Sequence, residues 1–411
     1  MADSDIAAWA ASGAMALTGR ADGPPSVAPA GLVGAARAAA ADVAEMTSRI
    51  GWPVVVDGPA LLGERAAIAG FGRQGAVSVG GAARFERAAD GWVVLNLPRP
   101  DDVACLPALL EADVETDDWP SVAALIGARS SSSLIERGRL LGVAIAAPDE
   151  RPAVVAPTRV LAKGSGRTPV ERPLVLDLTS LWAGPLAGSI LVAAGARVVK
   201  VEGRGRPDGA RFGPEPFFDL LNAGKETLAI DFDDRADRRL LRTAMARADL
   251  VIEASRPRVM EQIEIHPTVL AAEAATSWIS ITGHGRTDDP TRIGFGDDAA
   301  VAGGLWVDGD GGPSFVADAV ADPLTGMVAG ALGAELLASD RAAVLDVPLA
   351  RVAAWAAPSA AYAPVSRLPD GGWVVESPAG RVVVEPPRAR SASISAPAFD
   401  AHGSALRDEF A

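Results

Sequence analysis

The sequence predicts an α/β protein with a doubly wound parallel sheet and a second, smaller α+β domain. The first observation is a complete strand–helix–strand pattern in residues 172–202. Residues 174–178 are apolar and strand-like, residues 185–191 are apolar at helical spacing, and residues 198–201 form a second strand. A proline stands in the first turn of this helix and Gly195 at its end. Because parallel strands need such a crossover, we expect helices to cover the sheet.

The second observation is a hairpin pattern that precedes this unit. Residues 84–87 and 92–97 alternate around a turn at 89–91, as expected for two antiparallel strands. Helices are expected after the hairpin, at 101–112, 119–128 and 131–140. We therefore predict the smaller α+β domain over residues 51–150 and a linker rich in proline and glycine over 151–170.

The turn after the first parallel strand argues against a dinucleotide cofactor. Glu202 ends the second strand, where a dinucleotide-binding fold carries its ribose-binding carboxylate. However, residues 182–188 read Trp-Ala-Gly-Pro-Leu-Ala-Gly and lack the glycine fingerprint. Proline replaces a backbone N–H that a pyrophosphate would need, so NAD binding is disfavoured.

Composition excludes several classes of function. The formal net charge of −14 argues against a nucleic-acid partner, and we found no uncharged apolar run of membrane-spanning length. The single cysteine, Cys105, excludes an intramolecular disulfide and a cysteine-rich metal site, and the 3 histidines show no metal-ligand spacing. The start, Met-Ala-Asp-Ser-Asp, lacks the basic region of a signal peptide. A cytoplasmic protein without a metal is expected.

Four motifs follow one another in the second half of the chain. They are Ala-Gly-Pro at 183–185, Val-Lys-Val-Glu at 199–202, Leu-Asn-x-x-Lys with a later Asp at 221–231, and Ala-Asp-Leu-Val-Ile-Glu at 248–253. In this order they resemble the class III CoA-transferase family, the CaiB/BaiF type. That family includes formyl-CoA and carnitine CoA-transferases and the α-methylacyl-CoA racemases.

The resemblance implies how the chain is organised. Residues 171–345 would form a Rossmann-like CoA-binding catalytic domain, and residues 346–411 a hairpin and tail that pack on it. It further implies that CoA or acyl-CoA is a substrate, that no cofactor is tightly bound, and that the protein forms a homodimer. The substrates would be an acyl-CoA and a carboxylic acid.

The resemblance implies Asp322 as the catalytic nucleophile. Residues 311–326 contain a glycine/proline turn, then this aspartate, then the start of a long apolar helix, as in the family. A free carboxylate can attack a thioester to give an acyl anhydride, which the released thiolate converts to an aspartyl-CoA thioester. From residue types alone, an ordinary helix N-cap is the favoured interpretation of Asp322, and only its position in the family pattern favours catalysis. Asp318 is the alternative nucleophile if the turn is shifted in register.

The resemblance also implies which residues contact CoA. They are Trp182, Ala183, Arg204, Asn222, Lys225 and Ile230. The basic residues near this segment could form a groove for the phosphates of CoA or could simply be solvated. Asp297 and Asp298 stand near a second acid of the family pocket, although surface solvation also explains them.

A faint internal repeat links the two halves of the chain. Residues 6–48 and 299–338 share an apolar segment, a glycine/proline turn and a helix rich in alanine. Residues 1–50 are therefore interpreted as a partial repeat of the large domain. Gly34 stands at the position that matches Asp322, so the first copy is predicted to be catalytically inactive. The smaller domain precedes the large one in this chain, whereas the resemblance implies the reverse order. The difference indicates a circular permutation or a fusion of two half-copies.

The sequence thus predicts an acyl-CoA:carboxylate CoA-transferase. Two alternatives stay open. The first is an α-methylacyl-CoA racemase, although Phe295 or a neighbour stands where the racemases have a histidine base. The second is a catalytically silent CoA-binding subunit.

Overall fold

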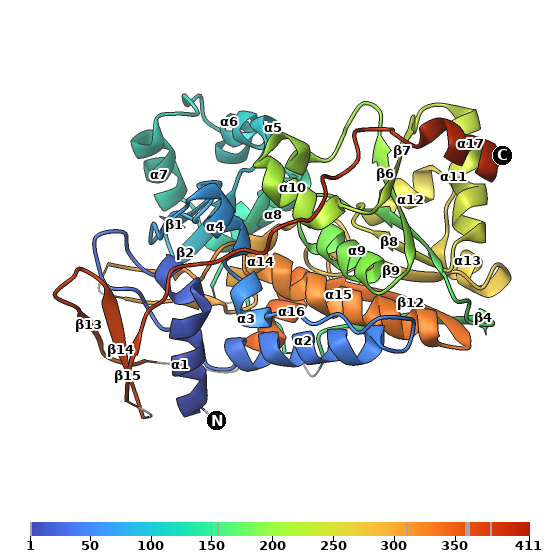
Figure 1. Cartoon of the computed structure of the whole chain (residues 1–411). Coiled ribbons are helices and arrows are strands. Elements are labelled where there is room, and N and C mark those ends of the chain that lie inside the picture. Colours follow the sequence, from blue (N-terminus) through green and yellow to red (C-terminus); the bar gives the residue numbers. More distant parts are fainter. Residues whose placement is uncertain (1, 149, 154–155, 310, 358–361, 379) are drawn as a thin grey trace.

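The fold is centred on a seven-stranded, mostly parallel sheet, which confirms the predicted fold class (Figure 1). The computed structural model describes residues 2–148, 150–153, 156–309, 311–357, 362–378 and 380–411. The strands of the sheet are β4 (Arg159–Gly166), β5 (Leu174–Leu178), β6 (Arg197–Gly203), β7 (Glu226–Ile230), β8 (Leu250–Glu253), β9 (Ser277–Thr282) and β12 (Arg341–Pro348). Their spatial order is β4-β12-β9-β8-β5-β6-β7. All neighbours are parallel except β4 and β12.

Helices cover both faces of the sheet. One face packs against α2 (Leu32–Thr47), α9 (Ala183–Ala193), α10 (Glu215–Asn222), α15 (Ala321–Ala338) and α16 (Leu349–Ala356). The other face packs against α11 (Arg235–Arg247), α12 (Pro257–Gln262), α13 (Pro267–Glu273) and α17 (Gly403–Phe410). Successive residues of a strand serve opposite faces: Val175 belongs to the first core, and Leu176, opposite Val199 in register, to the second. Each such buried aliphatic side chain contributes about 1.5–3 kcal/mol.

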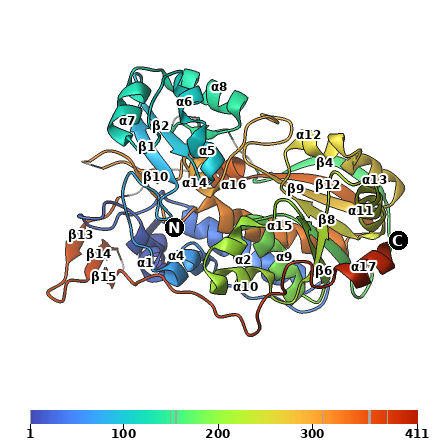
Figure 2. The same cartoon turned by 90° about the horizontal axis from the view of Figure 1, so that it is seen from above.

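The smaller α+β section has its own sheet and core. Its strands β1 (Ala83–Arg87), β2 (Trp92–Asn96) and β3 (Ala144–Ala146) form an antiparallel sheet. Its helices are α5 (Pro100–Ala104), α6 (Leu106–Leu110), α7 (Trp119–Gly127) and α8 (Ser131–Leu141). The predicted hairpin is confirmed, and the helix predicted at 101–112 is divided into α5 and α6 at Cys105. Figure 2 shows this section beside the large sheet.

The expected linker at 151–170 differs from the structure. β4 lies within it and pairs antiparallel with β12 at the edge of the large sheet. The glycines and prolines in this range are typical of a linker and do not indicate a strand. The hydrogen bonds that stabilise β4 come from β12, about 180 residues later in the chain.

The remaining elements are short segments between the parts described above and elements near the two ends of the chain. They are α1 (Ala2–Ser12), η1 (Ala14–Leu17), α3 (Gly58–Leu61), α4 (Glu64–Ala69), η2 (Gly209–Phe212), α14 (Gly296–Ala302), β10 (Trp306–Val307), β11 (Ser314–Phe315), β13 (Val365–Arg367), β14 (Trp373–Ser377) and β15 (Gly380–Val383). β14 and β15 form the hairpin expected near the C-terminus, and α1 packs against them. An extended tail then crosses the molecule to α17 (Figure 1).

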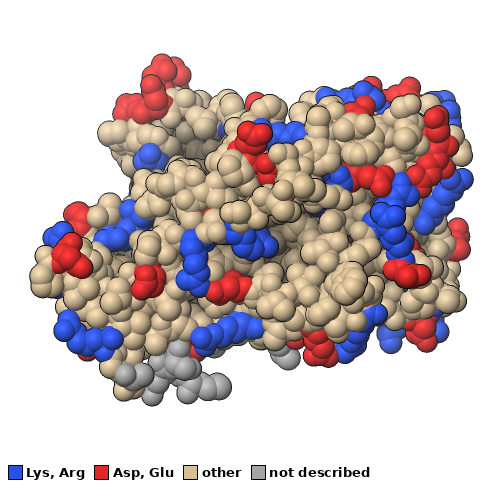
Figure 3. Space-filling view, viewed as in Figure 1, with Lys and Arg blue, Asp and Glu red and all other residues tan. Residues whose placement is uncertain are grey.

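On the face seen in Figure 3, acidic and basic side chains are interspersed. Within the described residues, no helix is long and apolar enough to cross a membrane.

Candidate functional site

The N-termini of α9 and α15 meet at the carboxyl edge of the large sheet. α9 begins directly after β5, next to the point between β5 and β8 where the strand order reverses, and ligands bind at such points in α/β sheets. Glycines allow α15 to approach α9 closely. A Cβ on Gly326 would lie 2.7 Å from the carbonyl oxygen of Ala183, and one on Gly330 would lie 2.9 Å from Ile190. The first turn of α15 is therefore held beside Trp182 and Ala183.

Four carboxyl groups gather at this N-terminus, and we call them the acid cluster: Asp297, Asp298, Asp318 and Asp322. The first two lie on α14, Asp318 lies in the turn before α15, and Asp322 is the second residue of α15. The approach is close, since a Cβ on Gly296 would lie only 2.3 Å from Oδ2 of Asp322. Like charges at this spacing oppose one another's ionisation.

Asp322 is the partly exposed and unpaired member of the acid cluster. Within the described chain, its carboxyl group makes no hydrogen bond or ion pair. Val320 occupies the N-cap position, so the N-cap interpretation of Asp322 is wrong. Burial raises the pKa of Asp322 to about 7; the neighbouring carboxyl groups act in the same direction and Arg65 opposes them.

Asp318 is committed to an ion pair. Its side chain is buried and accepts hydrogen bonds from Arg65 on α4, one from Nε at 3.0 Å and one from Nη2. Such a bidentate pair restricts both side chains to one geometry. The alternative nucleophile of the sequence analysis is therefore occupied, whereas Asp322 is not.

The other two acids are buried, so the interpretation of them as solvated surface residues is wrong. Asp297 is 7% exposed and Asp298 is 0% exposed. Asp298 accepts hydrogen bonds from Nδ2 of Asn96 at 2.8 Å and from the backbone N–H of Phe295 at 2.9 Å. Burial raises the pKa of Asp297 to about 7 and that of Asp298 to about 6.

The turn that presents Asp322 is strained. Ala317 and Ala319 have φ angles of 53° and 43°, a left-handed region that costs a residue with a Cβ about 1–3 kcal/mol. The hydroxyl of Thr18 accepts the N–H of Ala317 at 2.9 Å, and Asp297 accepts that of Ala319 at 3.2 Å. Strain held by surrounding contacts is typical of functional sites.

Trp182 and Ala183, the two predicted CoA contacts at the start of α9, lie beside α15 and Arg65. Trp182 is buried, its ring meets Phe217 edge-on at 5.1 Å between centroids, and the guanidinium of Arg65 lies 5.1 Å from its centroid. Its indole Nε1 is buried without a hydrogen-bond partner among the described residues.

Three other predicted CoA contacts lie in the interior, and the structure gives their predicted role no support. Lys225 is buried and donates to Asp177 at 2.8 Å, to the carbonyl of Pro185 at 2.9 Å and to Asn222 at 3.1 Å. Ile230 is a core residue at the end of β7. Lys225 and Asn222 join α9 and α10 to β5, because a buried ionic group must be paired.

Arg204 lies on the surface, in the loop after β6. Its guanidinium is paired with Asp400 of the tail at 3.0 Å. An anionic ligand at Arg204 would therefore compete with this carboxylate.

Three residues of the site were missed in the sequence: Thr18, Arg65 and Asn96. Arg65 and Asn96 contact the acid cluster and Thr18 contacts the turn before α15, each from the first quarter of the chain and 200 or more residues before its partner. No spacing rule connects positions that far apart, although the faint repeat does bring Thr18 to notice.

A nearby cavity does not include Asp322. It has a volume of about 970 Å³ and is lined largely by residues 20–29 and 304–314. These are the glycine/proline loops of the two repeat copies.

Comparisons with known proteins agree on one family. Residues 173–371 match the model of CoA-transferase family III. An acetyl-CoA:oxalate CoA-transferase of Acetobacter aceti is 32% identical over 29% of this chain and 32% of its own length. A succinyl-CoA:glutarate CoA-transferase of Mus musculus is 31% identical over 41% of this chain and 42% of its own length. The chain thus spans less than half the length of these relatives.

Two solved structures are similar to parts of this chain. A CaiB/BaiF family protein from Brucella suis covers 58% of this chain and 98% of its own at 18% identity, with a TM-score of 0.48. The Mycobacterium tuberculosis protein Rv3272 covers 46% of this chain and 55% of its own at 31% identity, with a TM-score of 0.41.

Proposed function

Residues 173–371 of this chain belong to CoA-transferase family III, and on this premise we propose that the protein is an acyl-CoA:carboxylate CoA-transferase with Asp322 as its nucleophile. The observation that carries the proposal is a partly exposed, unpaired carboxyl group in the first turn of α15, a helix of 18 residues. A nucleophile must be reachable and must have a lone pair that no other contact occupies.

The chemistry follows from this carboxylate. Its oxygen attacks the thioester carbonyl of an acyl-CoA and the carbon–sulfur bond breaks. The CoA thiolate departs, and an aspartyl acyl anhydride remains on the protein. The thiolate then attacks the aspartyl carbonyl and expels the donor as a free carboxylate, which leaves an aspartyl-CoA thioester. An acceptor carboxylate attacks the carbonyl of the aspartyl-CoA thioester, which releases the CoA thiolate and forms a second anhydride. The thiolate then attacks the acyl carbon of the acceptor, which gives the product acyl-CoA and restores the carboxylate of Asp322.

The position of Asp322 favours these steps electrostatically. The N-terminus of a helix carries partial positive charge and free N–H groups, which stabilise a carboxylate and the oxyanion that develops during attack. Its pKa of about 7 leaves a substantial ionised fraction at neutral pH and makes the group a more basic nucleophile than an ordinary aspartate.

The substrates belong to the same proposal. CoA would approach the carboxyl edge of the sheet, with Trp182 and Ala183 beside the thioester and Arg204 toward a phosphate. Relatives are named for the acids oxalate, glutarate and mesaconate, which supports a carboxylic acid as the acceptor here. A homodimer is proposed by analogy with the family.

A trapping experiment tests the proposal. The protein is incubated with a panel of acyl-CoA donors and carboxylic acids. The aspartyl-CoA thioester on Asp322 is then trapped by hydroxylamine, which leaves a hydroxamate, or by borohydride, which reduces it; both release CoA, and mass spectrometry locates the adduct that remains on Asp322. Wild type should form the adduct, Asp322→Asn should not, and Asp113→Asn, which changes an exposed acid, should behave as wild type. Binding of CoA without any adduct would instead identify a silent CoA-binding subunit, and α-proton exchange in deuterated water a racemase.

A further inference from the structure

Arg65 reaches the acid cluster from outside the segment that matches the family. It lies in the first turn of α4, more than 100 residues before residue 173. The neighbouring residue, Glu64, is buried and is bound by Arg390 of the C-terminal tail through two contacts of 2.7 Å. α4 is thereby fixed on both sides, so the guanidinium of Arg65 is held in place.

The guanidinium of Arg65 joins the two loops of the site. It forms the bidentate pair with Asp318, which belongs to the strained turn, and it lies over the ring of Trp182 at the start of α9. A cation over an indole face is attracted to it by about 0.5–2 kcal/mol. Gly80 leaves the space that this arrangement needs, since a Cβ there would lie 3.1 Å from Nη2 of Arg65.

Arg65 also supplies positive charge where negative charge accumulates. The charged groups that act on Asp322 are Asp297 and Asp298 from α14, Asp318 from its own turn, and Arg65 from α4. Arg65 opposes the other three. A second arginine, Arg292, acts on Asp298 but is paired with Glu150.

We infer that Arg65 is a positioning residue of the transfer reaction: it anchors the turn that presents Asp322 and, by its charge, favours the carboxylate form of that nucleophile. The inference rests on the function proposed above. It makes the first quarter of the chain a necessary part of the site.

The inference is tested by the pH dependence of a single turnover. Formation of the trapped adduct on Asp322 is measured between pH 5 and pH 9, with the acyl-CoA donor that wild type uses. The proteins are wild type, Arg65→Gln, Arg65→Lys and the double variant Arg65→Gln with Asp318→Asn. Arg37→Gln is the matched control, because Arg37 is an exposed arginine on α2.

Arg65→Gln should slow adduct formation at least about tenfold and move its midpoint to higher pH by about one unit, because a positive charge near the carboxyl group is lost. Arg65→Lys should keep the midpoint of wild type and lose rate, because the charge remains while the bidentate contact is lost. The double variant should move the midpoint back toward that of wild type, because a negative neighbour is removed as well. Thermal melting reports folding of each variant.

The outcomes separate this inference from the proposed function. A wild-type rate and midpoint in Arg65→Gln, with the adduct still formed, would overturn the inference and leave the function intact. If Arg65→Gln does not fold, Arg65→Lys decides: a rate equal to wild type would overturn the anchoring role. Failure of wild type to form any adduct would remove the proposed function first, and the inference with it.

Discussion

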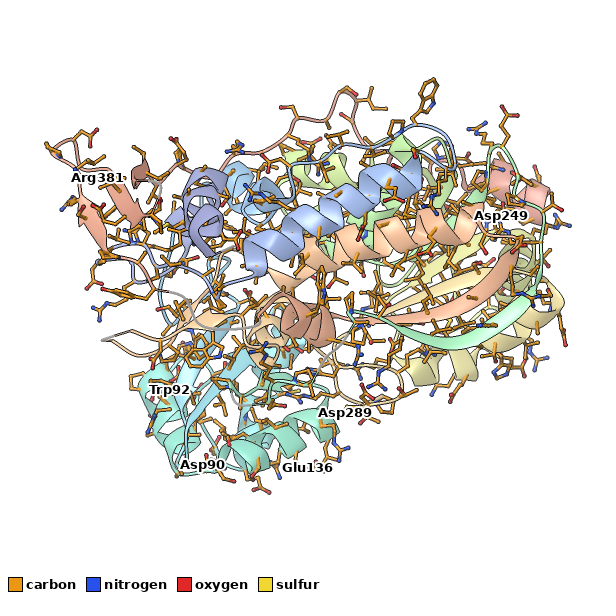
Figure 4. All side chains as sticks on the ribbon, turned by 90° about the horizontal axis from the view of Figure 1, so that it is seen from below. Asp90, Trp92, Glu136, Asp249, Asp289 and Arg381 are labelled. Carbon is orange, nitrogen blue, oxygen red and sulfur yellow. The ribbon has the colours of Figure 1, made fainter. Side chains whose placement is uncertain are left out.

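The two segments interpreted as copies of a repeat share the order helix, glycine/proline turn, helix, but they differ in the residues at the second helix. In the N-terminal copy, α1 is followed by a glycine/proline turn and α2; in the second copy, α14 is followed by such a turn and α15. α2 and α15 pack against each other side by side, as Figure 4 shows in blue and orange. Yet α15 carries Asp322 in its first turn, whereas the first turn of α2 has no acidic residue.

The difference shows that the residues needed to pack a helix after a glycine/proline turn are not the residues that make a chemical site at its N-terminus. An apolar helix after a glycine/proline turn is enough to build the layer against the sheet. The N-terminus of α15 has, in addition, four carboxyl groups, a strained turn and a cation. The N-terminal copy has become a support for the other, because the hydroxyl of its Thr18 holds the N–H of Ala317.

The largest expected effect tests whether position alone makes a nucleophile. Asp322→Asn should reduce CoA transfer at least about a thousandfold, because the attacking oxygen is lost. Adding Gly34→Asp to that variant restores a carboxylate at the matching position of the N-terminal copy, where a Cβ has open space. We expect no recovery of activity, since no acid cluster surrounds it. Recovery in the double variant would show that the two copies are chemically equivalent.

Much of this comparison was accessible from the sequence, and the rest was not for physical reasons. Local periodicity predicted β5 and α9, and the family pattern predicted Asp322. The burial of Lys225 was not predicted, because its acidic partner, Asp177, stands 48 residues away and residue types do not reveal a buried ion pair. Arg65 was missed for the same reason, since its pairing with Asp318 exists only in the folded chain.

The next effect concerns the contact between the two copies. Thr18→Val should destabilise the protein by about 1–3 kcal/mol, because the N–H of Ala317 would be left buried without an acceptor. Adduct formation should slow as well, since the strained turn would lose a restraint. Thr18→Ser, which keeps the hydroxyl, is the control and should resemble wild type in both urea unfolding and rate. Equal stability of the valine and serine variants would contradict the supporting role.

A smaller effect is the cost in stability that the acid cluster imposes on the second copy. Burial raises the pKa of Asp322 above its value in the unfolded chain, so the folded state binds more protons between about pH 4 and pH 7. Its contribution to stability is therefore lost as pH rises through this window. Asp322→Asn should be more stable than wild type by about 1–2 kcal/mol at pH 8, after allowance for partial exposure, and should gain little at pH 4. Urea unfolding at both pH values measures this, with Asp113→Asn as a control that should show no pH-dependent gain.

The smallest expected effect compares how tightly α2 and α15 are packed, through Gly→Ala substitutions in each helix. Gly34 lies on the exposed side of α2, and a Cβ there would meet no atom within 4 Å. Gly34→Ala should therefore stabilise the protein by about 0.5–1 kcal/mol through helix propensity and leave the rate unchanged. The same change at Gly330 of α15 should destabilise it, because that Cβ would press on Ile190 at 2.9 Å. Opposite signs at the two glycines would show that α15, held against α9 to present Asp322, is packed more tightly than α2; equal signs would remove that distinction between the copies.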